Sequence, residues 1–94
     1  MPKGYVIASV TVTDPVAWER YAAKAKDAFT KYGGKPVVRG GRVELIEGAG
    51  RARNVVLEFE SFDQARAYVH SPEYAEAQKE RTAAGLMNMV VVEG

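Results

Sequence analysis

Five side chains that can bind anions or carry protons are spread along the sequence: Arg39, Glu58, His70, Tyr74 and Arg81. Tyr74 and Arg81 are seven residues apart, so a helix through this region places them on one stripe. An arginine on a helix face that meets the protein normally finds a carboxylate or a ligand anion. We therefore predict ligand-binding roles for Arg39, Tyr74 and Arg81, and a proton acceptor in His70 or Glu58.

These roles have structural alternatives. Arg81 can instead form a bridge within the protein, and Arg39, which directly precedes a glycine pair, invites the same two interpretations. The groups available for such a bridge to Arg81 are Glu58, Glu47 and the chain terminus. For His70, the only histidine, the alternative is a position on the surface.

Metal and nucleophile chemistry have little support in the sequence. It contains no cysteine, and it lacks the H-x-x-x-H and Glu-x-x-His spacings of metal-binding helices. Ser71 follows His70 directly but has the position of a helix cap, and a nucleophilic dyad needs side chains that meet in space beside an orienting acid. We expect no metal and no cofactor.

Two glycine pairs flank a short apolar run in "KYGGKPVVRGG". Neither pair fits a dinucleotide or phosphate-loop motif, since Gly33-Gly34 follows a predicted helix and presents carbonyl groups where a phosphate needs N–H groups. We predict that Gly33-Gly34 ends that helix and that Gly40-Gly41 forms a bulge in an extended arm. A tight hairpin between Val37–Arg39 and Val43–Ile46 fits the same residues.

The composition indicates one small globular domain. The chain has 94 residues and a formal net charge of +1, and its lysines and arginines alternate with acids instead of forming the basic face typical of nucleic-acid binding. No signal peptide and no run of the roughly 20 apolar residues of a membrane span is present, so we expect a cytoplasmic protein without nucleic-acid or membrane partners. A core this small favours oligomerisation.

The hydrophobic pattern predicts the order βαββαβ. Residues 5–13 and 54–60 alternate like strands, a helix begins after Asp14-Pro15, and residues 86–93 form the last strand. The second helix is predicted in two parts, with Ser61 and Ser71 as caps and Gln64 reaching back to the Ser61 N–H. The order is typical of an α+β ferredoxin-like sandwich, with a four-stranded antiparallel sheet and helices on one face.

Helices with single apolar stripes leave the other face of the sheet uncovered. This face mixes apolar and polar residues, and a second copy of the chain would bury the apolar ones. Its predicted members are Tyr5, Ile7, Ser9, Thr11, Asn54, Val56 and Glu58. The alternative is an antiparallel sheet face exposed to solvent.

Several spaced motifs resemble a known family. They are "Y-x-x-A-x-V-x-V-x-DP", "YGGKPVVRGG" with "EG" following, "V-x-EF-x-S", "SPEY" with Arg81 after it, and the terminal "VVVEG". Together they cover essentially the whole chain and are similar to the DUF1330 family of the dimeric α/β-barrel superfamily. The resemblance implies a single 1–94 domain of ferredoxin-like fold whose sheet packs on a partner's sheet to form a barrel, and it implies no established activity.

Two functions remain open on this sequence. The first is a cytoplasmic homodimer, joined through its sheet faces, that binds a small metabolite in a cavity between sheet and helices or in the dimer barrel, either as a binding protein or as a cofactor-independent enzyme. The second is a non-catalytic structural or stress-related module without a ligand. An RNA-recognition module shares the topology, but the strand "RNVVLEFE" carries Glu58 where bases would stack.

Overall fold

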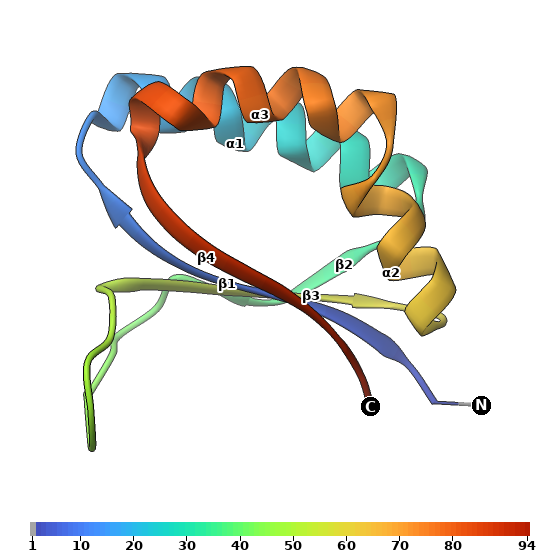
Figure 1. The fold of residues 1–94 in the computed structure, drawn as a ribbon, viewed down its shortest axis with the longest axis horizontal. Helices are drawn as coiled ribbons and strands as arrows, with labels where there is room; N and C mark the ends of the chain where they lie inside the picture. Colours follow the sequence, from blue (N-terminus) through green and yellow to red (C-terminus); the bar gives the residue numbers. More distant parts are fainter. Residues whose placement is uncertain (1) are drawn as a thin grey trace.

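A four-stranded antiparallel sheet carries three helices on one face in the computed structural model, which describes residues 2–94 (Figure 1). The sheet order is β2-β3-β1-β4. The elements are β1 (Gly4–Val12), α1 (Pro15–Lys31), β2 (Lys35–Arg39), β3 (Arg53–Phe59), α2 (Phe62–Val69), α3 (Pro72–Ala84) and β4 (Gly85–Glu93). The predicted α+β ferredoxin-like order is confirmed, including the second helix in two parts.

Local capping sets the limits of α1. The Asp14 carboxylate accepts hydrogen bonds from the Val16 and Ala17 N–H groups at 3.1 and 3.2 Å, and Pro15 occupies the first turn. At the other end Gly33 has a φ of +80°, which turns the chain back so that the Gly34 N–H donates to the Phe29 carbonyl at 2.7 Å. The first glycine pair ends the helix as predicted.

The split between α2 and α3 follows from two serine caps. The Ser61 hydroxyl accepts from the Gln64 N–H at 3.0 Å, and the Ser71 hydroxyl accepts from the Tyr74 N–H at 3.0 Å. The predicted return bond from the Gln64 side chain is wrong. Its amide donates instead to the Tyr32 carbonyl at 2.8 Å, where it satisfies an acceptor at the end of α1.

The second glycine pair differs from its prediction. The register shift in β2 lies between Pro36 and Val38, whereas Gly40, with a φ of +75°, turns the chain out of the sheet. Residues 40–52, which we call the arm, then form a loop that leaves the sheet on the side away from the helices (Figure 1). The run Val43–Ile46 is not a strand, and its apolar side chains are exposed, up to 80% for Ile46.

The core lies between the sheet and the helices. It combines one set of alternating strand residues with small and aromatic helix residues, and Tyr68 of α2 is at its centre with 1% of its surface exposed. The Tyr68 ring stacks on Phe59 at a centroid distance of 5.4 Å and meets Phe29 and Tyr74 edge-on at 6.3 and 5.1 Å. Burial raises the pKa of the Tyr68 hydroxyl, so Tyr68 is neutral.

The opposite face of the sheet carries no helix, as predicted. The strand register aligns four apolar side chains across all four strands of this open face, and we call them the apolar row. In strand order they are Val38, Val56, Ile7 and Val90. Polar contacts flank the row: the Tyr5 hydroxyl donates to Glu58 at 3.3 Å, and Arg51 donates to Thr11 at 3.0 Å.

Candidate functional site

A cavity of about 260 Å³ lies between the core face of the sheet and α1, and we call it the first cavity. All four strands contribute to its wall, which is mainly apolar and includes Trp18, Phe29, Met87 and Met89. Its charged lining residues are Lys26, Arg39 and Arg53. Because no carboxylate lines the cavity among residues 2–94, its wall carries positive charge only.

Arg39 and Arg53 flank the arm on its two sides. Arg39 closes β2 and pairs in register with Val55, while Arg53 opens β3 and pairs with Val10, so both arginines belong to the core face of the sheet. The Arg53 guanidinium lies over the Trp18 ring, 5.2 Å from its centroid. The Arg53 Nε atom is buried and has no hydrogen-bond partner within residues 2–94.

A second cavity of about 370 Å³ brings together three of the residues selected from the sequence. His70 at the end of α2, Tyr74 and Arg81 of α3 all line it. Arg81 donates to the Gly85 carbonyl at 3.3 Å, and none of the carboxylates in the described chain pairs with it. Within residues 2–94 the structure therefore contains no bridge from Arg81 to Glu58, Glu47 or the chain terminus.

The two cavities are neighbours. Met87 and Met89 of β4 line both of them, while Tyr21 lines the first and Tyr74 the second. The hydroxyl oxygens of these tyrosines are 3.1 Å apart, and burial raises the pKa of both hydroxyls. Both tyrosines are therefore neutral at physiological pH, and one hydroxyl donates to the other.

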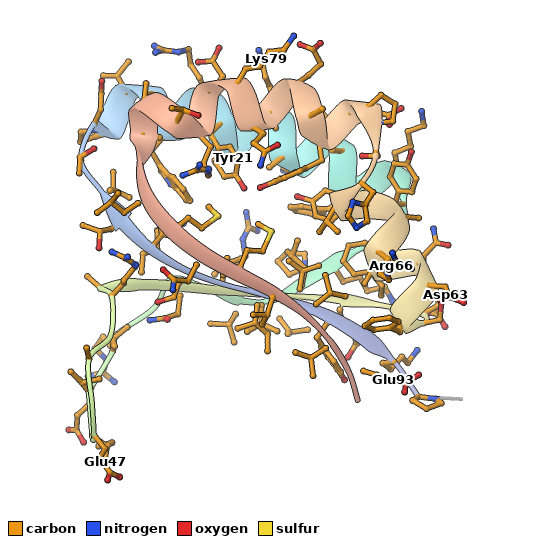
Figure 2. All side chains as sticks on the ribbon, in the orientation of Figure 1. Tyr21, Glu47, Asp63, Arg66, Lys79 and Glu93 are labelled. Carbon is orange, nitrogen blue, oxygen red and sulfur yellow. The ribbon has the colours of Figure 1, made fainter. Side chains whose placement is uncertain are left out.

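Glu58 and Glu47 lie away from both cavities. Glu58 is on the open face, where it accepts the bond from the Tyr5 hydroxyl. Glu47 lies at the far end of the arm (Figure 2) and, in the part of the chain described, does not pair with Arg39. Of the two proton acceptors selected from the sequence, only His70 lines a cavity, and its side chain is exposed.

Arg53 and the two methionines were not among the site residues predicted from the sequence. The signal for Arg53 was present, because it precedes Val55 and Leu57 in the same alternating set, which the pattern assigns to the core face. Met87 and Met89 alternate with exposed residues in β4 in the same way. Strand alternation thus assigns all three residues to the core face of the sheet, but it does not indicate that a cavity lies between this face and α1.

No three side chains of metal-ligating type cluster anywhere in residues 2–94. In the same part of the chain, no helix combines the length and the apolar character needed to cross a membrane.

Comparison with known proteins gives a family and a fold. Residues 3–94 match the family described as "Domain of unknown function (DUF1330)". No curated protein matches the chain. The RPA0582 protein of unknown function from Rhodopseudomonas palustris has a similar solved structure, with a TM-score of 0.74, 20% identity, and coverage of 99% of this chain and 82% of that one.

Two other solved structures share the fold at lower identity. A dimeric ferredoxin-like protein of unknown function from Jannaschia sp. CCS1 has a TM-score of 0.64 at 13% identity, with 98% of this chain and 99% of that one covered. SnoaB, a cofactor-independent oxygenase from Streptomyces nogalater, has a TM-score of 0.63 at 14% identity, with 100% and 94% covered. At these identities the likeness concerns the fold alone.

Proposed function

We propose that this chain, which belongs to the DUF1330 family, binds a small amphipathic organic anion in its first cavity. The observation that carries this proposal is the composition of the cavity wall: apolar side chains together with Lys26, Arg39 and Arg53, and no carboxylate. Ligand pockets typically combine a largely apolar lining with a few placed polar groups. The net charge of the whole chain is only +1, so it does not explain why the cavity wall carries cationic side chains and no carboxylate.

We further propose that the binding unit is a homodimer joined through the open faces. The apolar row would lose its contact with water in such a pairing, since two facing sheets pack through the side chains of their inner faces. The exposed apolar residues of the arm, including Leu45 and Ile46, would find cover on the partner. Several solved proteins of this fold are described as dimeric, which supports the proposal.

The second cavity supplies the groups for a reaction of the bound anion. In this proposal the imidazole of His70 exchanges a proton with the ligand, the Arg81 guanidinium stabilises negative charge, and the Tyr74 hydroxyl offers a further hydrogen-bonding group. A proton transfer built on these groups requires no cofactor, and the similarity in fold to a cofactor-independent oxygenase is compatible with it. Glu58 has no part in this proposal because it lies on the open face.

Native mass spectrometry of the purified protein tests ligand binding without a prior choice of ligand. We expect a dimer in which each subunit carries a small non-covalent mass increment that denaturing solvent removes. The matching ligand at ten times its Kd would stabilise the fold by about 1.4 kcal/mol. For a domain of this size that corresponds to a rise in Tm of roughly 5–10 °C.

Separate Arg39→Ala and Arg81→Ala variants distinguish the proposed site from the structural alternative. Loss of the mass increment with an unchanged Tm supports a ligand-binding role for the arginine concerned. A lower Tm or loss of the dimer, with no ligand detected in the wild type, supports the non-catalytic module instead.

A further inference from the structure

Arg53 differs from the other arginines of the chain because one donor of its guanidinium is buried and unused. Its Nε atom has no hydrogen-bond partner among the described residues, although it lies inside the protein. A buried donor of a charged group that stays unpaired costs free energy, so the native state gains from any acceptor that reaches it. The Nε and one Nη group of a guanidinium form the pair of parallel donors that matches a carboxylate.

The surroundings of Arg53 hold the guanidinium in place. Its Cζ atom lies over the Trp18 ring, 5.2 Å from the ring centroid. Gly40 makes room for it, because a Cβ atom at that position would lie only 2.7 Å from Nη1 and 2.9 Å from Cζ. None of the ion pairs formed within residues 2–94 involves Arg53.

We infer that Arg53 is the anion-binding residue of the first cavity and that its ligand class is a small aromatic carboxylate. This inference rests on the function proposed above and names its ligand. The cavity places the rings of Trp18, Tyr21 and Phe29 and the thioethers of Met87 and Met89 around the space next to Arg53. Aromatic rings and thioethers both make favourable contacts with a flat ring. With about 260 Å³ of space, the cavity suits a ligand smaller than those of typical drug-binding pockets, which start at about 300 Å³.

A matched pair of probes tests the inference on the full-length protein. Phenylacetate and phenylacetamide have the same shape, but only the first is an anion, and inorganic phosphate is an anion without a ring. Isothermal titration calorimetry gives each Kd, and the fluorescence of Trp18, the only tryptophan, shows whether the probe reaches this cavity. We expect phenylacetate to bind at least about tenfold more tightly than the amide, because charged hydrogen bonds are the stronger ones.

In Arg53→Met the ratio of the Kd of phenylacetamide to that of phenylacetate should fall to nearly one, while both compounds still bind through the ring. Arg53→Lys, which keeps the charge but lacks Nε, should give an intermediate ratio. Arg66→Met is the matched control, since Arg66 is exposed on α2 and lines neither cavity. It should keep the full preference. If Arg53→Met does not fold, as judged by circular dichroism, the Arg53→Lys ratio decides.

The outcomes separate the inference from the proposed function. If phenylacetate binds the wild type but Arg53→Met keeps the acid preference, or if acid and amide bind equally, the inference is wrong while ligand binding stands. If phosphate binds as tightly as phenylacetate, the assignment of an aromatic carboxylate is wrong. If neither ring compound binds at millimolar concentration, the inference is wrong, and if in addition no mass increment is found, the proposed function fails with it.

Discussion

The hydroxyl oxygens of Tyr21 and Tyr74 lie 3.1 Å apart in the buried interior and join α1 to α3. Their rings meet edge-on, with centroids 6.3 Å apart at an interplanar angle of 83°. Tyr21 lines the first cavity and Tyr74 lines the second. The same hydrogen bond therefore holds α1 against α3 and joins the walls of the two cavities.

Tyr21→Phe should lower the free energy of unfolding by about 1–3 kcal/mol, because it leaves the buried Tyr74 hydroxyl without a partner. Urea denaturation at pH 7 measures the change. The double variant Tyr21→Phe/Tyr74→Phe should lose clearly less than the sum of the single variants, since neither hydroxyl is then left unpaired. Strictly additive losses would contradict the coupling.

The fold could be predicted because its signals are local. The alternation of residues 5–13 and the Asp14-Pro15 start of α1 depend only on nearby residues, and both were confirmed. The run Val43–Ile46 has the same β-prone composition but no neighbouring strand, since β3 begins only at Arg53. Strand propensity without a pairing partner does not make a strand, and the arm is the result.

Less of the site could be predicted, because cavities depend on packing between distant segments. The seven-residue spacing of Tyr74 and Arg81 brought both to one cavity, as a helical stripe should. By contrast, the contact of Arg53 with Trp18 joins the start of β3 to α1 and has no local pattern. Strand alternation assigned Glu58 to the open face, where the structure has it, although the sequence also suggested Glu58 as a proton acceptor.

Gly85→Ala should be strongly destabilising, whereas Gly41→Ala should not. A Cβ atom at Gly85 would lie 2.0 Å from the Thr11 carbonyl oxygen, and the paired backbone of β1 has little freedom to move. Overpacking of this kind typically costs about 1–3 kcal/mol. A Cβ at Gly41 meets nothing within 4 Å, so this variant is the control. Thermal unfolding measures both, and equal Tm values for the two variants would contradict the predicted clash.

Glu80→Gln should make the stability of the protein less dependent on pH. Glu80 accepts from Arg20 at 2.9 Å and from Lys24 at 3.4 Å, and the hydrogen bond from Arg20 is the main cause that lowers its pKa. A carboxyl group whose pKa is lowered in the folded state stabilises the protein at pH values above its ordinary pKa. This stabilisation is lost as the pH falls through the lowered pKa. The wild type should therefore unfold at a higher temperature than the variant at pH 7.

The difference in Tm between the wild type and Glu80→Gln should shrink as the pH is lowered from 7 to about 3, across the usual range of carboxyl pKa values. Glu76→Gln serves as the control, because within residues 2–94 Glu76 pairs with Lys79 alone, on the same helix, and is largely exposed. An effect of Glu80→Gln that is the same at both pH values would mean that the carboxylate charge is not its cause.

Val90→Lys should convert the proposed dimer into a monomer without unfolding it. Val90 belongs to the apolar row, and 52% of its surface is exposed in the single chain, so a lysine there is compatible with the fold. In two sheets packed face to face, the same lysine would bury a charge at the centre of the interface, which is costly without a partner charge. Static light scattering at micromolar concentration measures the mass, and circular dichroism checks the fold.

Val16→Lys is the matched control for this change. Val16 has an exposed fraction of 63% on the first turn of α1, in the layer that covers the other face of the sheet (Figure 1). The same substitution adds the same charge there, so general repulsion between chains would affect both variants alike. If Val90→Lys dissociates the dimer and Val16→Lys does not, the interface lies on the open face. A wild-type monomer would refute the dimer, and a dimer that survives Val90→Lys would exclude a central position of the apolar row in the interface.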